Sequence, residues 1–584
     1  MVGPSWGATL MLNKSPSLLG RIIVLVVLLF GFGMFGAQLK DVFGQWLPAV
    51  PVAVVGLLIL WPRNGAADWK LQIAVGAGMT GLLFLLLYFF GPAPTIDSHG
   101  KEQTSVGMVA LAVGGLAVVW WLQSVIFGSK DENDGILGSA RFGGKKDEGA
   151  LTNSDGDLII GRSANGKLLR YDGAAHLLTI APTRSGKGVG TIIPNLLKAD
   201  RSIICIDPKG ENARVAGRHR ESVGAVYYLD PFGLSGRRSA RYNPLDRLKP
   251  DSLDLAEDAM TLADALVFDQ EESDPHWNEE AKALLAGLIL YTVCHDEPHL
   301  RNLATVREYL TLSPKDFEAL LTIMQASTEA RGLIARAANR YLSKSDREAA
   351  GVLSGAQRHT HFLDSPRIAN VMEASDFNFA ALKERIATVF LILPPDRLDT
   401  YARWLRLLLA QSLSEMARSP ARPARPVLFL LDEFAALGKL QPIERAMGLM
   451  AGYGLQLWPI LQDIHQLRSL YSERAGTFLS NAGVLQAFGV NDYETAEILS
   501  KTMGKTTVQY ATQGESEKTS IFDGRDHSVS TTQHLAARNL MDPNEIMKLE
   551  PRDMLLMMVG KNPLILRKIR YFEEKEFAGL HDQS

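Results

Sequence analysis

The chain has 584 residues, of which 46% are hydrophobic, and its 61 Lys and Arg against 64 Asp and Glu give a formal net charge of −3. This length accommodates several domains, and the hydrophobic content excludes an intrinsically disordered chain. The balance of charges argues against a protein that coats nucleic acid through a broadly basic surface. Two cysteines, Cys205 and Cys294, exclude a disulfide framework and favour a reducing compartment for the water-soluble part.

The first 127 residues contain long apolar runs that predict membrane helices. Ile22–Leu39, Leu71–Phe90 and Val106–Phe127 have no charged residue. At about 1.5 Å per residue, each is long enough to cross about 30 Å of hydrocarbon. Leu47–Trp61 is shorter and contains two prolines, and we predict it as a further span. Residues 1–130 are therefore expected to form a transmembrane region of about four helices.

Basic residues between the predicted spans indicate how the region is oriented. Cytoplasmic loops are enriched in Lys and Arg, so four spans with both chain ends in the cytoplasm agree best with the distribution, although Lys40 and Lys101 are exceptions. A cleaved signal peptide is the alternative for the first span, but it lacks a small-residue cleavage site and later spans follow it. The basic residues on the predicted cytoplasmic side are Lys14, Arg21, Arg63, Lys70, Lys130, Arg141, Lys145 and Lys146.

A glycine-rich turn follows the apolar run His176–Ile180 and precedes the apolar run Ile192–Leu197. A strand, a turn of this kind and a helix form the phosphate loop of nucleotide-binding proteins, in which backbone N–H groups, the helix N-terminus and a lysine face the phosphates. Lys187 is the predicted lysine. The residues predicted to bind the nucleotide are Thr183, Arg184, Ser185, Gly186, Lys187, Gly188, Val189, Gly190 and Thr191.

Two positions of this turn depart from the usual phosphate-loop pattern. Ala181 stands where the first glycine is usual, and Gly188 stands where a Ser or Thr hydroxyl usually binds Mg²⁺. We therefore predict that Thr191 or water completes the metal shell. An ordinary loop remains an alternative for the turn taken alone.

A second apolar strand, Pro426–Leu431, ends in the two carboxylates of Asp432 and Glu433. Asp432 is predicted to hold a water-bridged Mg²⁺, and Glu433 to lie beside an attacking water. Strands that end in two acids are common. Together with the turn at Lys187, this one is better explained as half of one nucleotide site, because both strands would end on the same edge of a parallel sheet.

The remaining pattern predicts an α/β fold with an insertion. Strands are expected at Ser202–Ile206, which runs into Asp207 and Lys209, and at Ala225–Leu229. A plain turn explains Asp207 and Lys209 as well as a site does. Residues 252–384 have helical periodicity without a strand, and strands alternate with helices afterwards, which favours a mostly parallel sheet. We predict nucleotide-binding segments at 131–251 and 385–584 around an all-α domain at 252–384.

Several motifs taken together resemble the type IV coupling proteins, the VirD4/TraG family of type IV secretion systems. The resemblance extends from about residue 135 to 570, and this combination is more specific than either nucleotide motif alone. The predicted membrane-anchored N-terminus also agrees, although four spans exceed the two common in that family. The matching stretches are Gly138–Arg141, Ala181–Leu197, Asp207–Glu211, Asn243–Leu245, Leu431–Phe434, Leu461–Leu467, Leu540–Leu549 and Gly560–Pro563.

This resemblance implies a multi-pass ATPase of the inner membrane, with the bulk of the chain in the cytoplasm. It implies a RecA-like P-loop NTPase that uses ATP and Mg²⁺ and assembles as a homo-hexameric ring with its all-α domain on the cytoplasmic side. The partners would be the secretion channel and a relaxase–DNA complex or effector proteins. Lys187, Asp432 and Glu433 would be catalytic. Gln462 would sense the γ-phosphate, although a buried structural glutamine explains it equally well. A ring also needs an arginine from a neighbouring subunit.

The cargo and the class of motor stay open at this stage. The first 127 residues contain six Lys and Arg and four Asp and Glu, so the rest carries a net charge of about −5. A ring can still hold DNA through a few basic residues; the arginines at 214, 218 and 220, or at 237, 238 and 241, are candidates, with a solvated surface as the commoner explanation. The alternatives are an FtsK-like DNA translocase, or a nucleotide-binding cargo receptor without motor activity.

Overall fold

The computed structural model describes residues 95–96, 98, 102–103, 136–267, 275–519 and 525–583. Contacts divide the chain into two units, Met1–Asp134 and Gly135–Ser584. In the described part of the first unit, β1 (Thr95–Ile96) pairs antiparallel with β2 (Glu102–Gln103). The described residues include no helix that is both long and apolar enough to cross a membrane. All four predicted spans lie outside the described residues.

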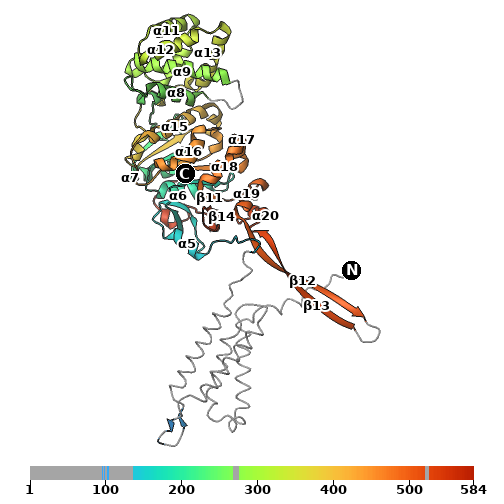
Figure 1. Cartoon of the computed structure of the whole chain (residues 1–584). Coiled ribbons are helices and arrows are strands. Elements are labelled where there is room, and N and C mark those ends of the chain that lie inside the picture. Colours follow the sequence, from blue (N-terminus) through green and yellow to red (C-terminus); the bar gives the residue numbers. More distant parts are fainter. Residues whose placement is uncertain are drawn as a thin grey trace. The chain divides into compact units, whose positions relative to one another are not determined.

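The second unit is built on an eleven-stranded sheet with the order β4-β3-β15-β14-β11-β5-β10-β9-β6-β8-β7 (Figure 1). All neighbouring pairs from β11 to β7 are parallel, and those from β4 to β11 are antiparallel. This arrangement confirms the α/β class. The strands are β3 (Leu158–Arg162), β4 (Leu168–Tyr171), β5 (His176–Ile180), β6 (Ile203–Asp207), β7 (Ala225–Leu229), β8 (Ala387–Ile392), β9 (Val427–Leu431), β10 (Leu455–Leu461), β11 (Ala482–Ala487), β14 (Asp553–Met558) and β15 (Leu564–Arg567).

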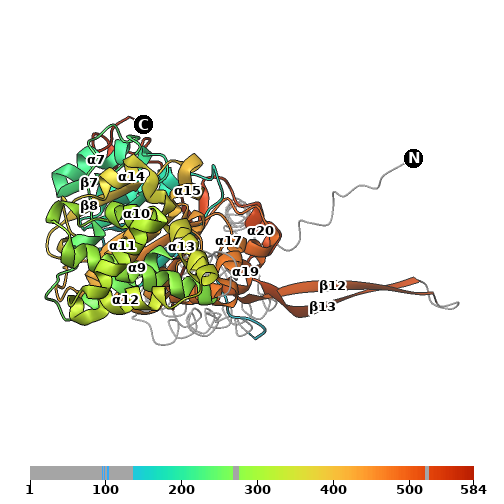
Figure 2. The same ribbon diagram turned by 90° about the horizontal axis from the view of Figure 1, so that it is seen from above.

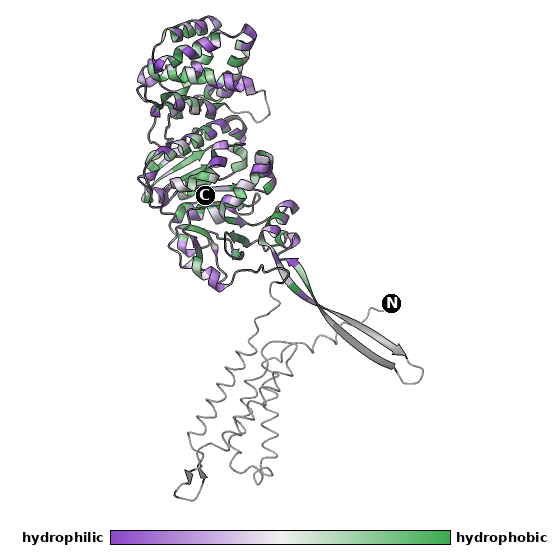
Figure 3. Ribbon diagram, viewed as in Figure 1, coloured by the Kyte–Doolittle hydropathy of each residue, from purple (hydrophilic) through white to green (hydrophobic). Residues whose placement is uncertain are grey.

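The central strands are apolar on both faces because helices cover both faces of the sheet. In β9, Phe429 and Leu431 pack into one apolar cluster, whereas Leu428 and Leu430 pack into the other. Alternate side chains of a strand point to opposite faces, so a strand buried on both sides reads as a continuous apolar run. Figure 3 shows these strands as an apolar layer between helices of mixed character.

Two groups of helices form the layers on the sheet. Residues of α6 and α7 pack into one apolar cluster, and residues of α15, α16, α17 and α18 pack into the other. The helices outside the segment between β7 and β8 are α5 (Lys145–Thr152), α6 (Ile193–Lys198), α7 (Glu211–Val223), α15 (Leu398–Arg418), α16 (Gln441–Leu449), α17 (Ile464–Tyr471), α18 (Ala475–Asn481), α19 (Tyr493–Met503) and α20 (Pro543–Met547).

Between β7 and β8, the described regular elements are all helical, and α9 and α11–α13 form a separate lobe (Figure 1). The longest of them, α9, is buried along most of its length and packs against α8, α12 and α13. The helices of this segment are α8 (Leu255–Leu266), α9 (Pro275–His295), α10 (Leu303–Leu310), α11 (Pro314–Ala326), α12 (Leu333–Leu342), α13 (Asp346–Thr360) and α14 (Pro366–Val371).

A long hairpin was not predicted. β12 (Lys505–Thr519) and β13 (Arg525–Asn539) pair antiparallel over their full length and extend away from the sheet (Figures 1 and 2). At its base, Thr506 bridges to Ser139, and the amide of Ala140 donates to the carbonyl of Lys505 at 2.9 Å. The hairpin sequence is polar, so it lacks the apolar run by which the other strands were recognised.

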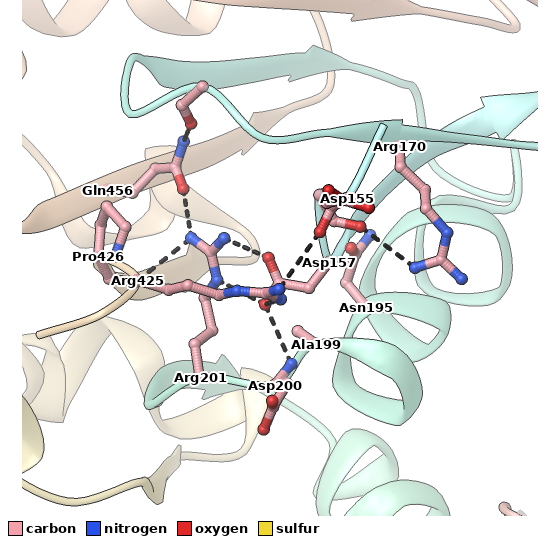
Figure 4. Close-up of polar contacts among 12 residues, drawn as sticks. Asp155, Asp157, Arg170, Asn195, Ala199, Asp200, Arg201, Arg425, Pro426 and Gln456 are labelled. Atoms are coloured by element: carbon pink, nitrogen blue, oxygen red, sulfur yellow. Dashed lines mark hydrogen bonds and ion pairs between the residues drawn. The ribbon is translucent and has the colours of Figure 1, made fainter. Parts of the chain in front are cut away.

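A buried ionic network ties strands together at the sheet edge where β6, β9 and β10 begin (Figure 4). The guanidinium of Arg201 donates to both oxygens of Asp157 and, at 2.6 Å, to Oε1 of Gln456. Arg425 lies 3.1 Å from Asp157 as well. Burial alone would raise the pKa of Asp157, but the two guanidinium groups lower it below its usual value. The network at this edge therefore stabilises the packing of the strands, whereas the predicted site lies at the opposite edge.

Candidate functional site

The predicted phosphate loop connects β5 to a single π-helical turn, η2 (Gly188–Ile192), which leads into α6. Gly186 has φ +93° and Arg184 has φ +64°. Residues that carry a Cβ rarely adopt a positive φ, so the conformation of the turn favours glycine at position 186. The amide of Gly190 donates to the carbonyl of Gly186 at 2.8 Å, which closes the first turn. The loop therefore presents a compact, helix-capping backbone of the kind that binds phosphate.

β5, β10 and β9 are consecutive parallel neighbours, so their carboxyl ends lie on one edge of the sheet. The loop follows β5, Gln462 follows β10, and Asp432 and Glu433 follow β9. Glu433 has φ +50°, a strained conformation for a non-glycine residue. Such strain at the end of a strand holds the carboxylate away from the direction that a continued strand would give it.

Lys187 is the centre of an ion-pair cluster at this edge. Its Nζ lies 2.5 Å from Oε1 of Glu433 and 3.2 Å from Oδ1 of Asp432. Burial lowers the pKa of Lys187, but the two carboxylates more than offset this and raise its pKa above the usual value. The same contacts lower the pKa of Glu433 despite its burial. For Asp432, burial outweighs the lysine, and its pKa is raised.

Gln462 completes the cluster from β10. Its Nε2 donates to Oε2 of Glu433 at 3.1 Å, so both oxygens of that carboxylate are engaged. The backbone amide of Gln462 donates to Oε1 of Gln466, one turn into α17. Gln462 is thus held between the first turn of α17 and Glu433, and its side chain helps to fix the position of the Glu433 carboxylate.

These groups line a cavity of about 620 Å³. Its volume falls in the usual range for a cofactor site. The predicted residues in its wall are Thr183, Arg184, Gly186, Lys187, Gly188, Val189, Asp432, Glu433 and Gln462.

Three predicted residues do not line this cavity. The hydroxyl of Ser185 donates to the carbonyl of Pro182 at 2.5 Å. Gly190 lies against the backbone of Ile569, which an added Cβ would approach to 3.1 Å. Thr191 is 2% exposed, and its carbonyl accepts from Asn195 at 2.8 Å. In this arrangement the Thr191 side chain is in the core, so a metal role for it requires the π turn to rearrange.

Asp207, which the sequence left open, lies in the cavity wall. Register pairs Ile206 of β6 with Leu431 of β9, which places the next residues, Asp207 and Asp432, side by side. Oδ2 of Asp207 accepts from the amide of Ala213 at 2.8 Å, whereas Oδ1 is buried without a partner among the described residues. Burial and the nearby Asp432 raise its pKa to about 6. Asp207 is therefore a third carboxylate of this edge.

Most of the other wall residues were not predicted because they lie at or after the ends of β6 and β8; of the remaining two, Ile193 begins α6 and Ala436 follows the acidic pair after β9. The sequence reveals these strands but not their order in the sheet, so it does not bring their ends to the cavity. Lys209 had been weighed against a plain turn, and the cavity wall includes it. The wall residues outside the predicted set are Ile193, Asp207, Pro208, Lys209, Glu211, Asn212, Pro395, Leu398 and Ala436.

A fold likeness to a solved structure agrees with this architecture. The plasmid coupling protein TrwB, in a complex with ADP and Mg²⁺, superposes with a TM-score of 0.56 over 74% of this chain and 94% of that chain, at 17% sequence identity. At this identity the likeness shows the fold alone, which is an α/β fold resembling that of TrwB. It agrees with the parallel sheet and its loop after β5.

Sequence comparisons give the family. The chain is 30% identical to the conjugal transfer protein TraG of Escherichia coli over 81% of this chain and 82% of that protein. It is 28% identical to VirD4 of Rhizobium rhizogenes over 86% of this chain and 75% of that protein. A family model described as "Type IV secretory system Conjugative DNA transfer" matches residues 131–583. The chain therefore belongs to this family, the VirD4/TraG coupling proteins of type IV secretion systems, and is a conjugative DNA transfer protein with a TrwB-like fold.

Proposed function

We propose that this coupling protein hydrolyses ATP with Mg²⁺ in the 620 Å³ cavity and uses the energy to drive DNA into a type IV secretion channel. The observation that carries the proposal is the meeting of Lys187, Asp432, Glu433 and Gln462 within hydrogen-bond distances at the carboxyl edge of parallel strands. Ligands of α/β proteins bind at this edge. Family membership makes a chromosome-partitioning translocase of the FtsK kind the weaker alternative.

The residues of the cavity have the chemistry that a magnesium nucleotide needs. Mg²⁺ prefers carboxylate oxygens and water, and Asp432 offers the former beside the unpartnered Oδ1 of Asp207. When bound, Mg²⁺ neutralises charge on the phosphate oxygens. Asp432 would help to hold the metal, and the Gly186–Gly190 backbone would hold the phosphates. Thr191, the other predicted metal residue, would contribute only after it leaves the core.

Lys187 links binding to catalysis in this proposal. In the structure its ammonium lies on Glu433 at 2.5 Å and so occupies the oxygen that a general base needs free. Transfer of Lys187 to the phosphates releases Oε1 of Glu433, which then orients a water and accepts its proton. Gln462 keeps Glu433 in place through the other oxygen. A general base of this kind contributes about 10²–10⁴ in rate.

The wider setting follows from the sequence and the family. We propose a multi-pass anchor in the inner membrane through the apolar runs of residues 1–127, with the bulk of the chain in the cytoplasm. The working form is a homo-hexamer, because this class of motor needs an arginine from the neighbouring subunit. Its partners are components of the secretion channel and a relaxase–DNA complex, with effector proteins as a further cargo.

The test compares plasmid transfer and ATP hydrolysis in variants of the full chain. Lys187→Ala and Glu433→Gln are introduced into the gene in its own host, and conjugative transfer is counted. The same proteins, purified in detergent, are assayed for phosphate release and for binding of a fluorescent ATP analogue. Glu473→Gln makes the same change at an exposed glutamate and is the matched control.

The expected outcome is loss of transfer in both variants at unchanged membrane level, with the control at wild-type frequency. Glu433→Gln should retain nucleotide binding and lose hydrolysis by about 10²–10⁴. If Glu433→Gln transfers DNA normally, the chain is a nucleotide-binding receptor and not a motor. If Lys187→Ala transfers normally too, nucleotide has no part in DNA export.

A further inference from the structure

A second cavity lies outside the nucleotide site, where α8 and α9 meet α15 and α16. Its volume is about 440 Å³. Its described wall contains a single acidic side chain, that of Asp264. Four basic side chains line it from three different helices and one loop: Lys282, Arg406, Lys439 and Arg445. The wall is therefore strongly cationic, in a protein whose net charge is negative.

Two of these cations are available to a ligand. Lys282 is already paired with Asp264 at 3.2 Å and with Glu279 at 2.7 Å. In contrast, Lys439 and Arg445 are exposed, and neither makes an ion pair or a side-chain hydrogen bond within the described part of the chain. Unpaired Lys and Arg facing one cavity repel each other, so an anion between them lowers the energy of both.

A buried arginine and a helix N-terminus in the cavity wall add positive electrostatic potential. Arg406 is 7% exposed, and its Nη1 donates to the carbonyl of Leu437 at 2.7 Å. The first residues of α16, Gln441 and Pro442, also line the cavity, and no side chain caps that helix N-terminus. The hydroxyl of Ser414 lies in the same wall. A buried guanidinium, a helix N-terminus and a hydroxyl are the groups that hold phosphate oxygens.

Most of the arginines that the sequence offered as DNA contacts have partners in the fold. Arg220 is fully buried and donates to Thr388 and to two backbone carbonyls. Arg218 pairs with Asp582 at 2.7 Å, and Arg241 pairs with Glu373 and Asp376. Arg214 donates to two carbonyls as well. Arg237 lies 3.9 Å from Glu221, and Arg238 is exposed. The cavity is the candidate that we favour, because it gathers four basic side chains in one wall.

One helix and one short turn link the cavity to the nucleotide site. The turn η9 (Phe434–Leu437) follows Glu433 directly; its Ala436 lines the nucleotide cavity, and its Leu437 carbonyl holds Arg406. The helix α15 contributes Leu398 to the nucleotide cavity and Arg406 to the second one. A ligand that draws on Arg406 therefore acts on the turn that positions the acidic pair.

We propose that this second cavity binds a backbone phosphate of the transported DNA as a single strand, through Lys439 and Arg445 with Arg406 behind them. The proposal deepens the proposed function, because it rests on DNA being the cargo of the motor. Binding here is independent of sequence, since phosphates carry no base information. Its strength should fall with salt in proportion to the phosphates contacted.

The test measures binding of a fluorescein-labelled 30-nucleotide poly-dT to the detergent-solubilised full chain by anisotropy, from about 50 to 300 mM NaCl. The variant is Lys439→Ala/Arg445→Ala. In the wild type, both of these side chains are exposed and have no ion pair among the described residues. The matched control, Lys315→Ala/Arg347→Ala, removes the same charge from exposed positions of the helical lobe. Binding of a fluorescent ATP analogue is measured on each protein, and inorganic phosphate is added as a competitor.

We expect about tenfold weaker DNA binding by the variant at 150 mM salt, with a salt slope smaller by about 0.7–1.4 and unchanged nucleotide binding. Equal DNA binding by variant and wild type, or an equal loss in the control, overturns the proposal. Phosphate competition that disappears in the variant while DNA binding does not change also overturns it, in favour of a small phosphate ligand. A failure of nucleotide binding in the wild type would instead refute the proposed ATPase, and the DNA result would still stand.

Discussion

Asp207 offers a direct test of the charge balance in the nucleotide cavity. Its carboxylate is 1% exposed and lies beside Asp432, with Oδ1 unpartnered among the described residues. Asp207→Asn removes the charge and keeps the shape. The amide oxygen of Asn can still accept from Ala213, as Oδ2 does now. The variant therefore isolates the cost of an ionised carboxylate at this position.

The magnitude follows from the shift of the pKa of Asp207 from 3.8 to about 6. A pKa raised in the folded state means that the folded protein binds the proton more tightly than the unfolded chain does. The stability from this proton is complete below about pH 4 and is lost as the pH rises through 6. By linkage, the raised pKa of Asp207 then lowers the free energy of unfolding by about 3 kcal/mol at pH 8 and by about 1.5 kcal/mol at pH 5, where the unfolded chain has already lost most of this proton.

Thermal unfolding of the metal-free full chain in detergent measures this difference. For a unit of this size, an unfolding entropy of about 2.1 cal/mol/K per residue makes 1 kcal/mol equal to about 1 °C. Asp207→Asn should therefore unfold about 3 °C above wild type at pH 8 and about 1.5 °C above it at pH 5. Asp254→Asn makes the same change at an exposed position and is the control. A variant that is less stable than wild type at pH 8, or a gap that does not change with pH, would refute the reasoning.

Three further results are expected. Gln462→Ala removes the 3.1 Å hydrogen bond to Glu433, so kcat for ATP should fall about 10- to 100-fold with nucleotide affinity within about threefold; an equal loss in both would make Gln462 a binding residue. Arg201→Ala leaves Asp157 buried without its main partner and should lower the unfolding free energy by about 3–5 kcal/mol, measured as a lower Tm; an unchanged Tm would show that Arg425 suffices. Excess EDTA should abolish binding of the fluorescent ATP analogue and leave poly-dT binding in place, whereas loss of both would tie DNA binding to the metal.

The predictable parts of the site are those in which one short segment contains both the strand and the functional residues. The loop around Lys187 and the strand that ends in Asp432 and Glu433 each combine an apolar run with functional residues directly after it. Parallel strands end on a common edge, so the two halves could be joined without knowledge of the strand order. β7 agrees with the predicted strand at Ala225–Leu229, and β6 lies within one residue of that at Ser202–Ile206.

The parts that escaped prediction depend on relations between distant segments. Asp207 enters the site only because β6 lies next to β9, which a single sequence does not reveal. The hairpin β12–β13 has no apolar face by which it could be recognised. The metal role of Thr191 stays a prediction, and the sequence does not reveal that this residue is buried at the π turn. The second cavity combines residues of α8, α9, α15 and α16, from Thr261 to Met450.

The two cavities differ in charge in a way that separates their ligands. The described wall of the nucleotide cavity holds Arg184, Lys187 and Lys209 against four acids, so a bare polyphosphate is repelled there unless a divalent cation accompanies it. The four acids are Asp207, Glu211, Asp432 and Glu433. The described wall of the second cavity has the opposite balance, which suits the phosphodiester that we propose for it. The helix α15 lines both cavities, and η9, whose Ala436 lines the nucleotide cavity, holds Arg406 of the second wall through its Leu437 carbonyl. In the proposed function, ATP and DNA are therefore coupled through one helix and one short turn.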